Sequence, residues 1–357
     1  MLASALSSRP LMKRTGLSRT PGELALIEAI RRQASRIRGS ASVRLGMGDD
    51  CAILRPRPGH EICVTTDFTL ENVHFRRDWH PAESVGHRCL ARGLSDLAAM
   101  GARPMAVFLS IALPGRLPSG WLDRFLHGFL DLAARHRAPL AGGDTAASAT
   151  GAIAADIVAV GEVRAGAALL RSGARPGDAL YVTGSLGGAA AELRQLSRNP
   201  RRFRRVTQGL SGHPHLFPEP RLAVGRRLRR LAHAGIDISD GLSTDLSHLC
   251  QESGVAAVLE EDRLPIDPLA REDPDALELA LHGGEDYELL FTASPDARIP
   301  RSITGVPIQR IGFIRRRRTG QPLMTLVTGA GRGLPLKAAG WQHFEEKSRA
   351  RRQAAKL

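Results

Sequence analysis

The chain has 357 residues, 43% of them hydrophobic, which is enough for about two globular domains with cores of their own. No apolar run approaches the roughly 18–20 residues that a membrane-spanning helix needs, so we expect a cytoplasmic protein with no membrane partner. The net charge is +14, but the basic runs are scattered and aromatic residues make up only 4% of the chain, so we expect no specific nucleic acid partner.

Residues 1–19 are rich in Ser and Arg and have no hydrophobic periodicity. We expect this segment to be disordered or to precede the native start. The N-terminal domain, which we place at residues 20–165, begins with a helix over 22–36. Its apolar positions, at 24, 26, 27, 30 and 34, share one helical face.

Strands and helices alternate through the rest of this half. A strand over 62–66 is expected to end at Asp67, and a helix over 82–100 is expected to carry Asp96 near its middle or at a local break. The other predicted elements are a buried strand (105–113), an amphipathic helix (119–136), a short strand that ends at 142–144, and a strand (153–163).

A polar turn over 171–178 marks a domain boundary, after which we place the C-terminal domain at residues 172–345. It begins with a strand over 179–183 that leads through a glycine-rich turn into an Ala-rich helix. The next predicted elements are a loop (198–220), a helix (221–233), a strand (236–239) and a helix (241–253), before further alternation. Residues 346–357 form a basic tail. The pattern is that of an α/β or α+β protein in two halves.

Acidic residues at strand ends and in glycine-flanked turns are the feature that points to chemistry. A carboxylate in an apolar setting such as Ile-Asp-Ile-Ser-Asp-Gly-Leu is costly unless it is paired or binds a metal ion. Mg²⁺ prefers oxygen ligands, typically one or two carboxylates per ion plus water and phosphate oxygens. Without a G-x-x-x-x-G-K-[ST] loop, several such ions would have to neutralise a triphosphate. The set comprises Asp49, Asp50, Asp67, Asp96, Asp144, Asp237, Asp240, Glu285 and Asp286.

Each carboxylate taken alone is explained equally well by structure. Asp96 fits the solvent face of a helix, and Asp240 fits a helix N-cap followed by Gly241. The turn from Gly184 to Gly188 is explained better by close packing than by nucleotide binding. The number of carboxylates in apolar strand and turn settings is what favours an enzyme that transfers phosphate from ATP.

Nine segments, in the order found in one family, carry a closer resemblance. They are Met-Gly-Asp-Asp-Cys-Ala-Ile-Leu (47–54), Thr-Thr-Asp (65–67), Asn-Val-His-Phe (72–75), Leu-Ser-Asp-Leu-Ala-Ala-Met-Gly-Ala (94–102), Gly-Gly-Asp-Thr (142–145), Arg-Ser-Gly-Ala-Arg-Pro-Gly-Asp (171–178), Asp-Ile-Ser-Asp-Gly-Leu (237–242), Gly-Gly-Glu-Asp-Tyr-Glu-Leu (283–289) and Gly-Trp-Gln-His-Phe (340–344). Through them the chain resembles the thiamine-monophosphate kinases, members of the aminoimidazole ribonucleotide synthetase and selenophosphate synthetase superfamily.

The resemblance implies an α/β (α+β) fold of two domains: an N-terminal sheet domain that pairs across a homodimer, and a C-terminal α/β sandwich domain. It also implies the reaction in which ATP and thiamine monophosphate give ADP and thiamine diphosphate, the last step of thiamine diphosphate biosynthesis. Because the acceptor is already an anionic phosphate ester, no general base is expected. Catalysis would then depend on several Mg²⁺ ions, at Asp67 and Asp144 above all, with direct in-line transfer.

The same resemblance implies the site residues, motif by motif. Magnesium is expected on Asp50, Thr65, Thr66, Asp67, Asp96, Asp144, Asp237 and Asp240. ATP is expected on Gly143, Asp144, Arg171 and Ser239, and thiamine monophosphate on His74, Glu285 and Trp341. Trp341 would stack on the cationic thiazolium or the pyrimidine, and the charge of Glu285 would favour the same cation. Asp49 is expected to support the turn rather than to bind an ion.

Two positions depart from the family pattern. Gly93 stands where the family has Asn, and residues 146–148 read Ala-Ala-Ser where the family often has Thr-Arg-Gly. Neither change removes a proposed carboxylate. Two alternatives stay open: another ATP-dependent synthetase of the superfamily, of the aminoimidazole ribonucleotide or selenophosphate type, and a basic RNA-binding protein with a degenerate ATP site. The motifs around His74 and Trp341 favour the kinase.

Overall fold

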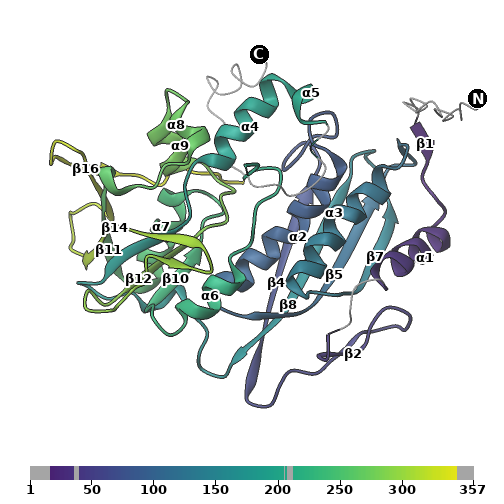
Figure 1. Cartoon of the computed structure of the whole chain (residues 1–357), viewed down its shortest axis with the longest axis horizontal. Coiled ribbons are helices and arrows are strands. Elements are labelled where there is room, and N and C mark those ends of the chain that lie inside the picture. Colours follow the sequence, from purple (N-terminus) through teal and green to yellow (C-terminus); the bar gives the residue numbers. More distant parts are fainter. Residues whose placement is uncertain (1–16, 36–39, 205, 207–211, 344–357) are drawn as a thin grey trace, which may run out of the picture.

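The protein forms two sheet-rich halves that lie side by side (Figure 1). The computed structural model describes residues 17–35, 40–204, 206 and 212–343. The predicted mixed α/β architecture is confirmed within these ranges. Residues 1–16 and the basic tail lie outside them, but Leu17–Arg19, which we expected to be disordered, forms strand β1 and pairs with β6 (Arg116–Pro118).

A four-stranded sheet is the frame of the N-terminal half. Its strands, in spatial order, are β4 (His60–Leu70), β8 (Ala154–Arg164), β5 (Arg103–Leu113) and β7 (Leu140–Ala147). The pair β5–β7 is parallel and the other two pairs are antiparallel. Around the sheet lie α1 (Glu23–Ala34), α2 (Ala82–Ala99), α3 (Trp121–His136) and a small ribbon of β2 (Val43–Leu45) and β3 (Ile53–Leu54).

Helices α2 and α3 cover one face of this sheet (Figure 1) and approach each other closely. A Cβ on Gly86 would lie 1.9 Å from the carbonyl oxygen of Phe125, and a Cβ on Gly128 would lie 1.9 Å from that of Glu83. Two glycines therefore allow the helix backbones to meet. Sheet, α3 and the C-terminal half surround α2, so nearly all of its side chains are buried.

The C-terminal half contains an eight-stranded sheet that is antiparallel except for one pair. In spatial order its strands are β10 (Ala234–Asp237), β12 (Leu289–Ala293), β9 (Ala179–Thr183), β14 (Val306–Arg316), β11 (Val255–Glu260), β15 (Met324–Val327) and β16 (Gly333–Leu336), with β13 (Ser302–Ile303) on β14. Its helices are α4 (Gly188–Arg198), α5 (Pro200–Phe203), α6 (Leu222–Leu228), α7 (Leu242–Ser253), α8 (Pro268–Arg271) and α9 (Ala276–His282), and 3-10 turns span Arg171–Gly173 and Glu261–Arg263.

The two halves share one apolar core across their junction. Leu222 and Leu228 of α6 and Phe291 of β12 belong to the same buried cluster as the core of α2 and α3. A Cβ on Gly225 would lie 1.8 Å from the carbonyl oxygen of Ala98, so α6 lies directly against the end of α2. This contact fixes the C-terminal end of α2 relative to β10.

Several element boundaries differ from their predictions. Strand β4 continues past Asp67 to Leu70 because it pairs with β8 along its whole length. The strand β7 likewise continues past Asp144 to Ala147, alongside β5. Asp96 lies in the last turn of α2, not at its middle or at a break. The predicted apolar face of α1 is only partly buried: Leu26, Ile30 and Ala34 face the core, whereas Leu24 is 83% exposed and Ile27 is 38% exposed.

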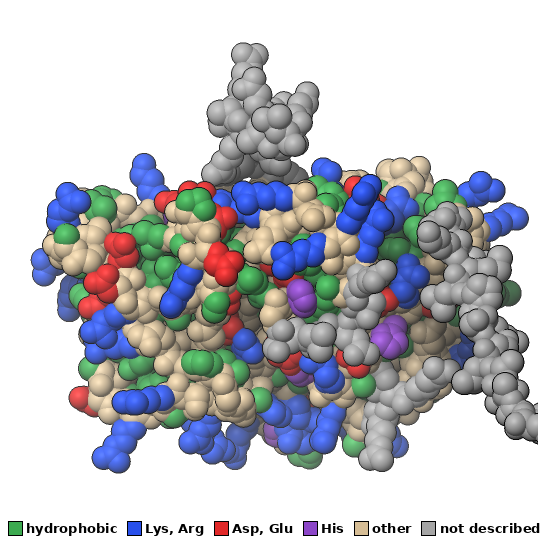
Figure 2. Space-filling view, turned by 45° about the horizontal axis from the view of Figure 1, so that its top comes forward, with side chains coloured by type: hydrophobic (Ala, Val, Ile, Leu, Met, Phe, Trp, Pro, Cys, Tyr) green, Lys and Arg blue, Asp and Glu red, His purple; other side chains and the backbone are tan. Residues whose placement is uncertain are grey.

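The positive charge is dispersed over the surface, as the scattered basic runs of the sequence predict. Lys and Arg side chains are spread over the face drawn in Figure 2 rather than gathered in one patch. Among the residues that the structure describes, no helix combines the length and the apolar composition needed to cross a bilayer.

Candidate functional site

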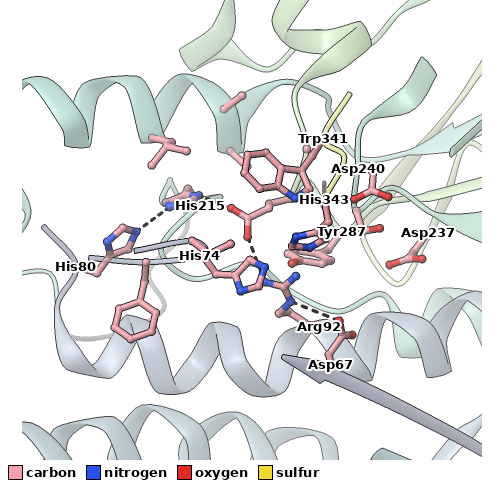
Figure 3. A pocket seen from close by; sticks show the side chains of 18 of the residues that line it. Asp67, His74, His80, Arg92, His215, Asp237, Asp240, Tyr287, Trp341 and His343 are labelled. Carbon is pink, nitrogen blue, oxygen red and sulfur yellow. Dashed lines mark hydrogen bonds and ion pairs between the residues drawn. The ribbon is translucent and has the colours of Figure 1, made fainter. Parts of the chain in front are cut away.

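A cavity of about 490 Å³ opens at the junction of the two halves. Its walls come from β4, the segment after it, α2, α4, β10 and the loop before β12 (Figure 3). Nine predicted site residues line it: Thr66, Asp67, His74, Asp96, Asp237, Ser239, Asp240, Glu285 and Trp341. Residues 170 or more positions apart in the sequence are thereby brought into one space.

The aspartates at one end of this cavity raise one another's pKa. Burial, together with Asp96, Asp156 and Asp240, raises the pKa of Asp67 to about 6 even though Arg92 opposes the shift. Burial and Asp96 raise the pKa of Asp237 to about 7. Hydrogen bonds hold the group: the Asp96 carboxylate accepts from Thr65 Oγ1 at 2.5 Å, and that of Asp237 accepts from Ser95 Oγ at 2.7 Å.

This donor set fits magnesium. Within the described ranges, no three His, Cys, Asp or Glu side chains converge closely enough to hold a metal ion by themselves. The four aspartates of the cavity are all-oxygen donors, and burial raises the pKa of each of them, so a cation among them would favour their ionised form. Mg²⁺ usually takes only one or two carboxylates per ion and completes its shell with water and phosphate oxygens.

The loop before β12 brings Glu285 into the cavity with unusual backbone angles. Glu285 has φ 68° and Tyr287 has φ 50°, a region that side chains rarely adopt. The surrounding structure holds this conformation, because the Glu285 N–H donates to Ser239 O at 2.7 Å and the Tyr287 N–H to Ile238 O at 2.9 Å. Strain of this kind is often kept at functional sites.

Glu285 is held as an anion. Its Oε1 accepts from Arg88 Nη2 at 2.5 Å, and its Oε2 lies 3.2 Å from His215 Nδ1. Burial by itself would raise the pKa of Glu285, but Arg88 and His215 outweigh burial and hold the pKa well below its ordinary value. The neighbouring residue Asp286 has a structural role instead, because its carboxylate accepts from two backbone N–H groups at the start of α4.

Two buried histidines, His80 and His215, lie behind Glu285, and His80 Nδ1 is near both the backbone N–H and the carbonyl oxygen of Arg76. The backbone N–H of Arg76 donates to His80 Nδ1 at 3.1 Å, and His80 Nε2 lies 3.0 Å from His215 Nε2. Burial lowers the pKa of both imidazoles, so both are neutral. Because His215 Nδ1 faces the carboxylate of Glu285 at 3.2 Å, we expect the proton of His215 on Nδ1 and its Nε2 lone pair directed at His80, which would then carry its own proton on Nε2. The other tautomers would place a lone pair against the carboxylate.

His74 also presents a single donor. Its Nδ1 accepts from the backbone N–H of Leu70 at 3.0 Å, and burial together with Arg92 lowers the pKa of His74 to about 3. The imidazole is therefore neutral, with its proton on Nε2. This buried nitrogen has no hydrogen-bond acceptor among the described residues.

Other predicted residues lie outside this cavity. Gly143 and Asp144 line a second cavity of about 270 Å³ between α1 and β7, together with Gly48 and Asp49. Asp49 Oδ1 accepts from the backbone N–H of the exposed Asp50 at 2.9 Å, as expected for a residue that supports the turn. The segments 47–54 and 142–145 therefore contribute to a different cavity from the one that the junction aspartates line.

Thr65 and Arg171 act on the junction aspartates without lining the cavity. Thr65 is bonded to Asp96. Arg171 is exposed, yet its charge lowers the pKa of Asp96, Asp237 and Asp240, so it faces the same cluster. Asp240 is not the N-cap of α7, because Gly241 occupies that position.

Residues missed by the sequence analysis complete the site: Arg88, Arg92, His215 and Tyr287. His215 follows an Arg- and Pro-rich loop that carries no motif, and Glu192 of α4 fixes it by accepting from its backbone N–H at 2.8 Å. The departure at Gly93 has a local reason. A Cβ there would lie 3.1 Å from Ala159 Cβ, so α2 sits too close to β8 for a larger side chain without a shift.

Comparison with known proteins gives a consistent result. The family model of the N-terminal domain of AIR synthase related protein matches residues 48–163 of this chain. The model of the C-terminal domain of the same family matches residues 175–309. The thiamine-monophosphate kinase of Salmonella typhimurium is 39% identical over 299 residues, 82% of this chain and 87% of that protein. The thiamine-monophosphate kinase of Bacillus subtilis is 33% identical over 313 residues, 85% of this chain and 95% of that protein.

Solved structures agree. The thiamine-monophosphate kinase from Stenotrophomonas maltophilia K279a matches with a TM-score of 0.73 at 36% identity, covering 90% of this chain and 100% of that one. AaThiL complexed with AMPPCP and TMP matches with a TM-score of 0.69 at 29% identity, covering 90% of this chain and 97% of that one.

Proposed function

The chain belongs to the thiamine-monophosphate kinase family, and we propose that it transfers the γ-phosphoryl group of ATP to thiamine monophosphate, giving ADP and thiamine diphosphate. The observation that carries the proposal is the junction cavity, which places an aspartate cluster for metal-bound phosphates beside an anionic Glu285 for a cationic substrate. A solved relative described as bound to AMPPCP and TMP supports the same pair of substrates.

Thiamine monophosphate has a positive thiazolium ring and a negative phosphate, so its two ends need opposite surroundings. We propose that Glu285 and Trp341 contact the ring end and that His74 donates from Nε2 to a phosphate oxygen. The ionised Glu285 attracts the thiazolium, and the uncharged His74 does not repel it. The phosphate then faces the aspartates of the cavity.

Transfer needs no strong base, because the acceptor oxygen already belongs to a phosphate anion. A phosphate oxygen of thiamine monophosphate forms the new bond to Pγ, and the bond from Pγ to the bridging oxygen of ADP breaks. We propose that Asp50, Thr65, Thr66, Asp67, Asp96, Asp144, Asp237 and Asp240 hold Mg²⁺, and that Gly143, Asp144, Arg171 and Ser239 contact ATP. When bound, Mg²⁺ would neutralise the repulsion between the two phosphates. Asp67, Asp96, Asp237 and Asp240 line one cavity before substrate arrives, whereas Asp144 lines the second cavity and Asp50 is exposed.

We also propose that the chain is a homodimer formed along β4. This strand lies at one end of the strand order of its sheet, and it exposes Ile62, Val64 and Phe68 on one face. An exposed edge strand with an apolar face invites pairing with another chain. Light scattering should give the mass of a dimer, and Phe68→Lys should shift it towards the monomer.

The direct test of function is turnover by the purified protein with ATP, Mg²⁺ and thiamine monophosphate. Thiamine diphosphate should form, and free thiamine should stay unphosphorylated. Asp67→Asn should abolish turnover with the fold intact, whereas Asp131→Asn, on the exposed side of α3, should have normal activity. Near-normal turnover by Asp67→Asn would refute the metal assignment. Absence of product from wild type that binds an ATP analogue would refute the substrate.

A further inference from the structure

Arg92 is a cation in the junction cavity, with a side chain that is 16% exposed, and none of the predicted roles uses it. It extends from α2 towards His74 and Tyr287, with Asp67 on its other side (Figure 3). Its Nε lies 3.7 Å from Asp67 Oδ1 and its Nη1 lies 3.7 Å from Glu285 Oε1. Both distances are too long for hydrogen bonds. Within the described part of the chain, Nε and Nη1 are buried without an acceptor.

A buried guanidinium with unused N–H groups is unfavourable unless something else accepts from them, since nearly all buried polar groups in proteins are paired. The two nearby carboxylates are already engaged. Glu285 accepts from Arg88 at 2.5 Å and lies beside His215. Asp67 belongs to the aspartate cluster proposed for Mg²⁺. Arg92 is therefore left with free donors directed into the cavity.

The position of these donors indicates what they bind. Arg92 lies at the border between the aspartate cluster and the residues proposed for the thiazolium, and His74 Nε2 is a second buried donor without an acceptor. Arg92 and His74 line the same cavity, and the charge of Arg92 adds to burial in lowering the pKa of His74. A planar guanidinium fork and a neutral N–H fit several oxygens of one tetrahedral anion.

We propose that Arg92, together with His74, binds the phosphate of thiamine monophosphate and holds it facing the aspartate cluster. This inference rests on the proposed function. The acceptor phosphate is favoured over a phosphate of ATP because Arg92 Nη1 faces Glu285 at 3.7 Å, and Arg88 donates to both Glu285 and the His74 carbonyl oxygen, which places the second donor on the Glu285 side. Bound in this way, the acceptor loses much of its repulsion towards the γ-phosphate, which is the main barrier to joining two anions.

Isothermal calorimetry with two ligands, thiamine monophosphate and thiamine, separates a phosphate contact from a structural role. Arg92→Met should weaken binding of thiamine monophosphate about 10- to 100-fold, the range for a lost charge-assisted hydrogen bond, and should leave thiamine binding unchanged. Arg92→Lys keeps the charge but loses the fork, so it should weaken binding of thiamine monophosphate less, by about 3- to 10-fold. Arg135→Met, which removes an ion-paired arginine from α3 outside the cavity, is the matched control and should change neither affinity.

Four results would overturn the proposal. Equal loss of thiamine and thiamine monophosphate binding would mean that Arg92 only supports the cavity. Weaker binding of AMPPCP with unchanged binding of thiamine monophosphate would assign Arg92 to the donor. Wild-type protein that does not bind thiamine monophosphate would refute the proposed function itself. Normal binding by wild type and equally tight binding of thiamine monophosphate by Arg92→Met would refute only this inference. If Arg92→Met does not fold, Arg92→Lys decides. The proposal is contradicted if this variant shows no selective loss of thiamine monophosphate binding.

Discussion

Replacing Asp237 by asparagine should stabilise the metal-free protein while it removes activity. Asp237 is 3% exposed at the end of β10, and its Oδ2 accepts from Ser95 Oγ at 2.7 Å. Burial and the nearby Asp96 raise its pKa to about 7. Asparagine keeps an oxygen that accepts from Ser95 but carries no charge, so the substitution removes the repulsion and retains the hydrogen bond.

The magnitude follows from the pKa difference between the folded and unfolded chain. An unfolded Asp titrates at about 3.9, so a folded value of about 7 disfavours the ionised form by about 4 kcal/mol above pH 8. Because Asp96 shares this repulsion, we expect ~2 kcal/mol from neutralising one partner. The contribution of Asp237 to the stability of wild type is most favourable below the unfolded pKa and is lost as the pH rises through about 7. The advantage of the variant should therefore be large at pH 8 and small at pH 5.

Thermal unfolding in EDTA at both pH values measures this difference, which should be several degrees at pH 8. Adding Mg²⁺ at pH 8 should raise the Tm of wild type more than that of Asp237→Asn, because the ion replaces the proton in relieving the cluster. A variant that is no more stable than wild type at pH 8, or whose advantage is the same at pH 5, would refute the electrostatic reasoning.

Three further predictions test other parts of the structure. His215→Leu should raise the KM for thiamine monophosphate about 10-fold, and His215→Asn should restore it, since Asn can donate to Glu285 as Nδ1 does. Nitrogen-15 NMR of wild type should show a neutral His215 with its proton on Nδ1. A proton on Nε2 would contradict the expected tautomer. Glu162→Gln should cost about 2–3 kcal/mol in chemical denaturation, because the buried carboxylate holds two arginines, and an unchanged midpoint would contradict this. Gly143→Ala should lower the free energy of unfolding by ~3 kcal/mol or more in the same assay, because the new Cβ would lie 1.9 Å from the Leu109 carbonyl oxygen and the backbone has φ 153°. A wild-type midpoint would contradict this and show that β7 accommodates the side chain.

Hydrophobic periodicity was sufficient to predict most elements of the fold. The strand Ala179–Thr183 and the helix Trp121–His136 match closely, because each has a clear apolar pattern between turn residues. The end of β4 was missed because Asp67 interrupts the apolar pattern, while pairing with β8 extends the strand to Leu70. Long-range pairing of this kind leaves no local signal in the sequence.

The site was predictable to the extent that carboxylates in apolar settings are costly and therefore rare. Asp67 and Asp237 could be selected on that ground, and the structure places both in the junction cavity. Arg92 and His215 could not be selected from the sequence. Arg92 is one of 50 Lys and Arg residues, and neither Arg92 nor His215 has a local sequence that differs from that of a surface residue. Their roles depend on burial between the two halves, which only the packing of α2 against the C-terminal half reveals.

Transfer of labelled phosphate tests the central claim most directly. Wild-type protein would be incubated with ATP labelled in its γ-phosphate, Mg²⁺ and thiamine monophosphate, and the products separated. The label should appear in the terminal phosphate of thiamine diphosphate, with one ADP formed for each labelled product, and none should appear when EDTA is present. Label recovered only as inorganic phosphate, or label on free thiamine supplied as the acceptor, would contradict the account.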